Sequence, residues 1–377
     1  MKKLIALVLV LVMALSAIGC AAKEEAAPAP AAPAAPAEAP AAEEPAEEPA
    51  EAPAEAEAPA EEELSYPHKT VTMIVPYGAG GTTDLIGRQM AAALGEVLGI
   101  TVVVENQAGA SGAIGCQAVL DAAHDGSVVL FNAENLGFQR TMGLSELSYA
   151  DFRPVMATAN DPKVVVVAGD SPYNTMQDLL DAMAANPNKI QMSYTGPGGS
   201  GHIQALLLNK LGYYPALTAY TKAAECIVAV IGGQVEFFNS NYSTVASYIE
   251  SGELKMLANC ANERLEKFPE IPCLGEILPD AKDYLDLEYC PCSLLVAADF
   301  PEDCYETLVK ATKKAVETDA FKAFMEDNCM DKMYEKYTTE QEMLDYYSTW
   351  ESIVSWILYD AGVAAHSPED FGIARAE

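Results

Sequence analysis

At residues 72–84 the chain reads TMIVPYGAGGTTD, and the helical pattern LIGRQMAAAL follows at residues 85–94. An apolar strand therefore runs into a glycine-rich turn and then into a helix. A second copy, QMSYTGPGGSGH at residues 191–202, is followed by IQALLL at residues 203–208. Each copy places backbone N–H groups and small hydroxyl side chains at a helix N-terminus, where anions bind. The two turns predict two half-sites that close on one acidic small molecule.

Around these turns, short apolar runs alternate with amphipathic stretches along residues 64–377. The pattern predicts strands at 71–76, 101–105, 127–132, 163–168, 191–194, 235–238 and 255–259, and helices at 84–98, 111–121, 175–186, 201–211, 223–232, 244–251, 301–318 and 339–358. Such alternation indicates an α/β fold with mostly parallel sheets flanked by helices. Ligands of these sheets bind at the carboxyl ends of strands, which is where both glycine turns lie.

The N-terminus predicts export. A short basic start precedes an apolar run at residues 4–14, which is too short for a membrane span of roughly 20 residues. The sequence AIGC at residues 17–20 resembles a bacterial lipobox, so residues 1–19 are expected to be a signal peptide and Cys20 a lipidated cysteine. An ordinary signal peptide that contains a cysteine is the alternative. Residues 20–63 continue as a disordered Ala/Pro/Glu linker with 13 glutamates.

The negative charge of the chain limits the classes of molecule that it can bind. The formal net charge is −33, of which −23 remains on residues 64–377 once the basic start (+2) and the linker (−12) are set apart. Nucleic-acid binding needs clusters of Lys and Arg, so this partner class is excluded. The same acidity opposes long-range steering of an anionic ligand, so an acid must be held by local donors.

The motifs also argue against an enzyme. The first turn is not GxGxxG, no lysine follows it as in a phosphate loop, and no GxSxG elbow is present. With 4 histidines in the whole chain, a histidine-based triad or metal centre is not expected, and neither is a cofactor. The eight cysteines after Cys20 are irregularly spaced, which favours mostly free buried thiols while leaving one or two disulfides open.

A series of further motifs lies before and after the first turn in a specific order. They are Tyr66-Pro67, Arg88, VVVEN at 102–106, GASGAIG at 109–115, Asp125-Gly126, SPY at 171–173, Tyr220, GGQVE at 232–236, SGELK at 251–255, Arg264 and FPEIP at 268–272. Together they resemble the solute-binding proteins of tripartite tricarboxylate transporters, the Bug or TctC-type receptors. The resemblance covers about 300 residues, essentially everything after the linker.

The resemblance implies a two-lobed fold of the type II periplasmic-binding-protein (Venus flytrap) kind and no catalysis. It implies an extracytoplasmic receptor that captures a di- or tricarboxylate or a related organic acid. From the resemblance together with the lipobox, we expect a monomer that is lipid-anchored to the cell membrane. The receptor would hand this ligand to the permease subunits of the transporter. An ABC-type binding lipoprotein and a non-transport surface lipoprotein are the alternatives.

The resemblance also implies ligand contacts at the two turns and at one strand end. These residues are Tyr77, Ala79, Gly80, Gly81, Thr82, Thr83, Gly198, Gly199, Ser200, His202, Asn239 and Ser240. Asp84 is better interpreted as a helix cap at ion-pair spacing from Arg88. His202 could contact the ligand or pack within its helix. Asn239 and Ser240 could contact it or form an ordinary polar turn.

The chain departs from the family pattern at four places, one of which is Val235-Glu236, where the family usually has Val-Asp. Thr82 replaces the third glycine of the first turn, residues 124–127 read HDGS instead of PDGY, and the segment 290–292 is atypical. The topology of the family implies that the first lobe comprises residues 64–165 and 260–377, and the second lobe residues 166–259. The crossings are expected near 164–168 and 257–262, with the C-terminal helices packed on the first lobe.

Overall fold

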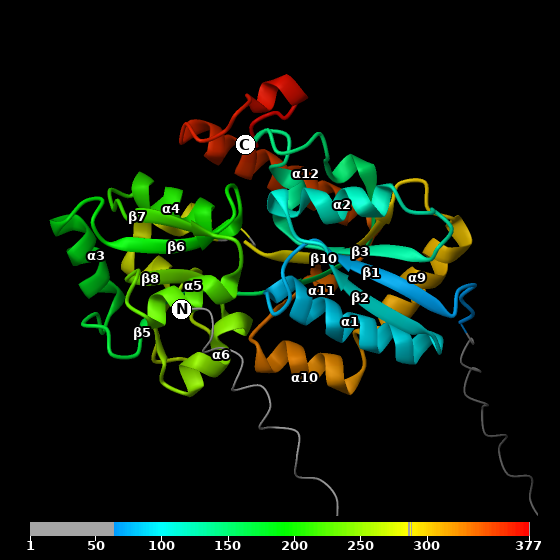
Figure 1. Ribbon diagram of the computed structural model, residues 1–377, viewed down its shortest axis with the longest axis horizontal. Coiled ribbons are helices and arrows are strands. Elements are labelled where there is room, and N and C mark those ends of the chain that lie inside the picture. Colours follow the sequence, from blue (N-terminus) through cyan, green and yellow to red (C-terminus); the bar gives the residue numbers. More distant parts are fainter. Residues whose placement is uncertain (1–63, 286, 288, 377) are drawn as a thin grey trace, which may run out of the picture. The chain divides into compact units, whose positions relative to one another are not determined.

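The two glycine turns belong to two different sheets of one compact part of the chain. The computed structural model describes residues 64–285, 287 and 289–376. The predicted signal peptide, lipidated Cys20 and linker lie outside these residues. The described residues fall within one unit, residues 61–377. This unit holds two sheets, each covered by helices (Figure 1).

The first sheet contains the strand that precedes the first turn, and its order is β11-β4-β10-β3-β1-β2. The strands are β1 (Thr70–Val75), β2 (Thr101–Asn106), β3 (Val128–Asn132), β4 (Phe152–Asn160), β10 (Pro291–Ala297) and β11 (Asp331–Lys332). One face is covered by α1 (Thr82–Leu98), α9 (Glu302–Ala315) and α10 (Asp319–Asp327), and the other by α2 (Ala113–Leu120), α11 (Met333–Lys336) and α12 (Glu340–Asp360). Met73 and Ile74 are buried in the two different cores, as the alternation of side chains along a strand requires.

The second sheet contains the strand before the second turn, in the order β7-β6-β8-β5-β9. The strands are β5 (Lys163–Ala168), β6 (Gln191–Thr195), β7 (Ala216–Tyr220), β8 (Phe237–Asn241) and β9 (Leu254–Asn259). One face is covered by α3 (Met176–Ala185), α4 (Ser200–Lys210), α7 (Leu274–Ile277) and α8 (Lys282–Leu285), and the other by α5 (Ala223–Ile231) and α6 (Tyr242–Glu250). Short 3-10 segments are η1 (Ala110–Gly112), η2 (Glu134–Gly137), η3 (Tyr149–Asp151), η4 (Pro279–Ala281) and η5 (Pro368–Phe371).

Both sheets are mixed. Strand β1 is parallel to β2 and β3, and β6 is parallel to β7 and β8. Strand β10 is antiparallel to β3 and β4, while β5 is antiparallel to β8 and β9. The predicted two-lobed α/β fold is confirmed, but the sheets are not mostly parallel. Strands β5 and β10 each begin directly after a passage between the sheets. A parallel strand would need a crossover connection within its own sheet, and neither of these strands is entered that way.

The chain passes between the sheets twice. Asp161 and Pro162 join β4 to β5, and residues 260–290 lead from β9 back to β10. Because β5 begins at Lys163, residues 163–165 belong to the second sheet, and the first passage precedes the predicted range 164–168. The crossing was predicted too late in the sequence, within the apolar run that follows Lys163. It lies at Asp161 and Pro162 instead, because Pro162 has no N–H to donate and so interrupts the sheet pairing.

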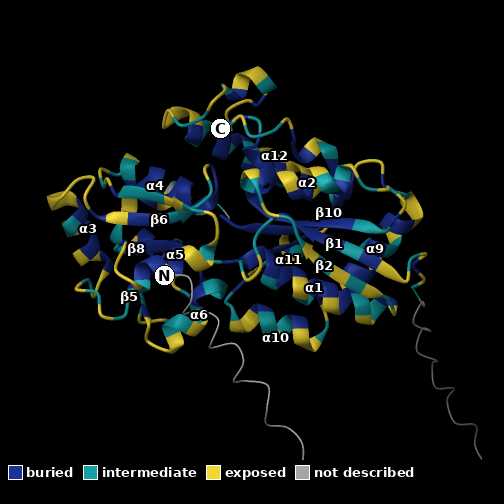
Figure 2. Ribbon diagram, viewed as in Figure 1, coloured by how far each residue is buried: buried dark blue, intermediate teal, exposed yellow. Residues whose placement is uncertain are grey.

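Strands β8 and β10 are buried along their whole length (Figure 2).

Helix α12 contacts both lobes. Outside the sheets, Trp350 and Val354 of α12 pack in one cluster with Phe138 of the first lobe and Ile203 and Leu206 of α4. The C-terminal helix thus packs on the first lobe, as expected, and also on the second. Within the described residues, no helix is both long and apolar enough to cross a bilayer.

Candidate functional site

The first glycine turn connects β1 to α1 and is held by an acid. Gly80 has φ +79°, a conformation that favours glycine, and its N–H donates to Asp84 Oδ2 at 2.8 Å. Burial alone would raise the pKa of Asp84, but hydrogen bonds from Arg88, Gly80 and Asn106 hold this pKa below its usual value. Asp84 is not the helix cap that the sequence predicted, because Gly81 is the N-cap of α1 and has no side-chain cap bond, but its ion pair with Arg88 is present at 2.8 Å. Asp84 instead holds the turn through Gly80, and the first N–H groups of α1 have no acceptor within the helix.

The second glycine turn connects β6 to α4 and is held by a histidine. Gly198 has φ +83°, and a Cβ there would lie 2.7 Å from Phe138 Cδ2. The N–H of Gly198 donates to Nδ1 of His202 at 3.1 Å, and the imidazole stacks on Tyr194 at 5.0 Å between ring centroids. Burial lowers the pKa of His202. Of the two predicted roles, these contacts favour packing within the helix end.

A cavity of about 110 Å³ lies where the two turns meet. Seven predicted site residues line it: Tyr77, Ala79, Gly81, Thr82, Thr83, Ser200 and Ser240. Five others do not: Gly80, Gly198, Gly199, His202 and Asn239. Asn239 is 2% exposed and donates to Gln204 Oε1 at 2.9 Å, so its side chain binds β8 to α4 and does not face the cavity. The structure thus brings both turns to one cavity. Gly80 and Gly198 do not line it, but their positive φ angles allow the tight turns to form.

The cavity contains charged groups that sequence reasoning did not find. Glu134, at the start of η2, and Lys163, the first residue of β5, both line it and are 7% and 8% exposed. Lys222 lines it from the loop before α5. Strand-end reasoning could have found Glu134, because β3 lies beside β1 and ends at Asn132.

Direct contacts join the two lobes around the cavity. Asp161, in the first passage, accepts a hydrogen bond from Thr82 Oγ1 of α1 at 2.8 Å and one from the Ser243 N–H of α6 at 3.3 Å. The hydroxyl of Ser243 also donates to Asp161. Ser111 Oγ donates to the carbonyl of Pro197 at 3.2 Å, from η1 to the second turn. Thr82, the departure from the family's third glycine, is therefore part of the contact between lobes.

Asp161 should make stability depend on pH. Burial raises its pKa to about 6, above the unfolded value of 3.8, despite the hydrogen bonds from Ser243 and Thr82. Its contribution to stability is fully present below pH 3.8 and is lost as the pH rises through about 6. We expect Asp161→Asn to exceed the wild type in unfolding free energy by up to roughly 3 kcal/mol at pH 7.5, with the difference shrinking below pH 6. Urea unfolding of both proteins at several pH values measures this, and a difference that is independent of pH would contradict it.

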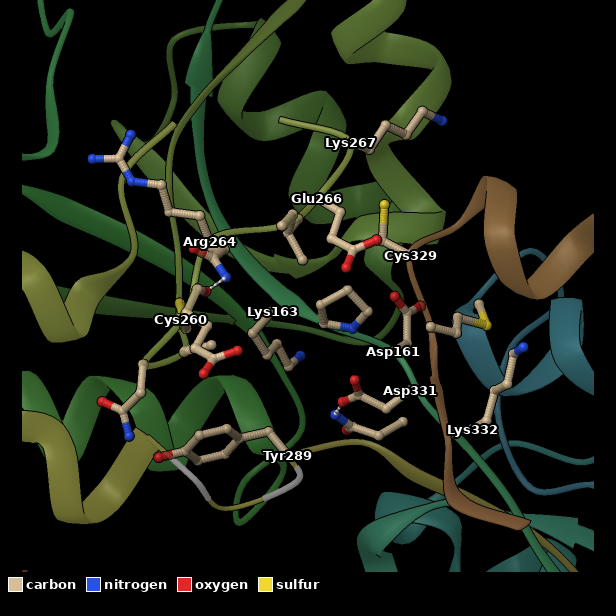
Figure 3. A pocket seen from close by; sticks show the side chains of 18 of the residues that line it. Asp161, Lys163, Cys260, Arg264, Glu266, Lys267, Tyr289, Cys329, Asp331 and Lys332 are labelled. Carbon is tan, nitrogen blue, oxygen red and sulfur yellow. Dashed lines mark hydrogen bonds between the residues drawn. The ribbon is translucent and has the colours of Figure 1, made fainter. Parts of the chain in front are cut away.

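A larger pocket, of about 1240 Å³, lies beside the passages between the lobes. Figure 3 shows Asp161, Lys163, Cys260, Cys329 and Asp331 around it. Neither glycine turn contributes to its lining, which mixes acids and bases. The smaller cavity is therefore the better candidate site, because it has oriented helix N-termini.

The cysteines and the metal-ligating side chains limit the chemistry that the described residues can perform. All eight cysteines of the described residues are free, and seven are buried. The sulfur atoms of Cys290 and Cys292 lie 3.9 Å apart, with Cys290 lining the cavity. In the part of the chain that the structure describes, no three His, Cys, Asp or Glu side chains are grouped to hold a metal ion.

The sequence of the chain is similar to those of known proteins. Residues 86–356 match the family model described as tripartite tricarboxylate transporter family receptor. A curated protein of Pseudomonas sp. strain P51 is 29% identical over 215 residues, which span 56% of this chain and 64% of that protein. Protein BugT of Bordetella pertussis is 29% identical over 218 residues, which span 56% of this chain and 67% of BugT. The chain thus spans about two thirds of the length of these relatives.

Solved structures share the fold. The periplasmic binding protein BugD superposes with a TM-score of 0.72 at 24% identity, covering 79% of this chain and 99% of BugD. MatC from Rhodopseudomonas palustris with bound malate gives a TM-score of 0.68 at 21% identity, covering 77% of this chain and 100% of MatC. The family that the matching model describes is one of receptors and not of enzymes. On its match over residues 86–356, this chain belongs to the tripartite tricarboxylate transporter receptor family.

Proposed function

We propose that the protein is an extracytoplasmic, monomeric solute-binding lipoprotein that captures a small metabolite with a carboxylate group. The ligand class is a di- or tricarboxylate or a related organic acid, delivered to a tripartite tricarboxylate transporter permease. The observation that carries the proposal is the meeting of two glycine turns, one from each sheet, at a single cavity. The family match favours the tripartite permease over an ABC transporter as partner.

The physical basis is local, because the excess of acidic residues repels anions at long range. The N-termini of α1 and α4 both lie at the cavity, with Thr82 and Thr83 of α1 and Ser200 of α4 in its lining. Lys163 and Lys222 add positive charge. The structural relative MatC holds malate, a dicarboxylate, which supports a ligand of this class.

A thermal-shift panel tests the proposal. Di- and tricarboxylates, amino acids and aromatic acids are each added to protein that has been unfolded and refolded to remove any endogenous ligand. A ligand at 100 times its Kd stabilises the folded state by about 2.7 kcal/mol, which raises the melting temperature measurably. If no acid shifts the transition, the proposed capture of carboxylates is wrong.

The anchor is proposed on Cys20 and needs its own experiment. We expect the wild-type protein to fractionate with the membrane, and Cys20→Ala to remain outside the cytoplasm but to leave the membrane fraction. Equal membrane association of the two proteins would remove the lipid from the proposal while leaving ligand capture intact.

A further inference from the structure

The cavity already contains a carboxylate that belongs to the protein. Glu134 lies in η2, beyond the end of β3, and is 7% exposed. Its Oε1 accepts a hydrogen bond from the backbone N–H of Ser200 at 3.3 Å. Ser200 is the first residue of the 11-residue helix α4. The first lobe thus provides the anion at the helix N-terminus of the second lobe, where one half-site for an acidic ligand was predicted.

This arrangement limits how many carboxylates a ligand can bring. A second ligand carboxylate at Ser200 would lie beside the buried charge of Glu134, and like charges in a shared site disfavour joint ionisation. At the N-terminus of α1, Asp84 is hydrogen-bonded to Gly80 and Arg88, and Asp161 to Thr82 and Ser243, but neither carboxylate lines the cavity. Among the described residues that line it, Glu134 is the one carboxylate. One ligand carboxylate therefore fits at α1, where Lys222 from the opposite lobe also lines the cavity.

The remaining oxygen of Glu134 favours a positively charged group. Glu134 lines the cavity, and its Oε2 makes no hydrogen bond or ion pair with any other described residue. Lys163 also lines the cavity, is 8% exposed, and likewise forms no ion pair with another described residue. A buried carboxylate is stabilised by a charge-assisted hydrogen bond, and an ammonium group offers three donors to form one.

We propose that the ligand is an amino acid, with its carboxylate at the N-terminus of α1 and its ammonium group at Glu134. This inference rests on the proposed function, since it narrows the class of carboxylate that the same cavity takes. Glu134 then selects for the amine in two ways: it pairs with the ammonium group, and it repels a second carboxylate from the N-terminus of α4.

Matched ligand pairs test the role of Glu134 directly. Aspartate and malate, and alanine and lactate, differ only by an amino or a hydroxyl group at the same carbon. Isothermal titration calorimetry compares the wild type with Glu134→Gln, which keeps the size of the side chain and removes its charge. Glu146→Gln is the control, because Glu146 is an exposed acid of the first lobe that does not line the cavity. Melting temperatures check folding, with Glu134→Asp as a second variant that keeps the charge.

We expect the wild type and Glu146→Gln to bind the amino member of at least one pair at least 10-fold more tightly. Glu134→Gln should lose this preference, and Glu134→Asp should keep part of it. The proposal is overturned if the wild type prefers the hydroxy acid, or if Glu134→Gln weakens both members by the same factor, as a mere contact between lobes would. Binding of none of the acids by the wild type would instead reject the proposed function.

Discussion

Gly81→Val should weaken the binding of the small acid at least 100-fold with little change in stability. Gly81 is the N-cap of α1 and lines the cavity. Its φ of −81° and ψ of 165° suit any residue, and an added Cβ would approach only the carbonyl oxygen of Gly78, at 3.4 Å. The branched side chain would instead extend over the first N–H groups of α1 and block the approach of the ligand carboxylate. A 100-fold loss corresponds to about 2.7 kcal/mol of binding free energy.

Calorimetric titration with the tightest acid of the panel measures this loss. Gly81→Ala should fall between the wild type and Gly81→Val, because one methyl group covers less of the helix end. Ala92→Val is the matched control, since it places the same side chain on an exposed position of α1 away from the turn. If Gly81→Val binds as tightly as Ala92→Val, the N-terminus of α1 is not where the carboxylate binds.

Local sequence patterns predicted the elements whose stability is local. The helix predicted at residues 175–186 forms as α3, and it begins with a local capping box in which the Asp178 N–H donates to Thr175 Oγ1 at 3.1 Å. The buried strand β5 was predicted at residues 163–168, where it lies. Strands β4 and β10 were not predicted, because Pro154 and the Cys290–Cys292 segment lack the alternation or the uniform apolar run of a strand. Their pairing depends on partners far along the chain, including each other.

The candidate site divides in the same way. Both turns could be found from glycine spacing and strand ends, because a glycine with positive φ, such as Gly198, is a local requirement. Which turn residues line the cavity depends on how the lobes meet. Thr82 was noted as a departure, but its partner Asp161 lies 79 residues further along the chain. Glu134 was missed because a search for donors to an anionic ligand passes over a carboxylate.

Trp350→Ala should lower the free energy of unfolding by about 3–5 kcal/mol, the largest loss of stability expected from a single side chain of α12. Trp350 is 1% exposed and packs against η2, where a Cβ on Gly137 would lie 2.7 Å from the indole ring. The same cluster includes Phe138 and, from α4, Ile203 and Leu206. Removal of the indole leaves a cavity between the two lobes that the surrounding helices can fill only partly.

The position of Trp350 also links this loss of stability to the candidate site. The hydrogen bond between the lobes joins Glu134, the first residue of η2, to Ser200, the first residue of α4. Trp350 packs against both of these elements. Urea unfolding measures the stability of Trp350→Ala, and Leu344→Ala, a partly exposed residue of the same helix, is the control. At a temperature where Trp350→Ala remains folded, we expect its affinity for the acid to fall as well, since η2 is less firmly held. Removal of a buried Trp side chain typically lowers the free energy of unfolding by about 3–5 kcal/mol. A loss below about 1 kcal/mol in Trp350→Ala, or an equal loss in Leu344→Ala, would therefore show that α12 does not hold the two lobes together.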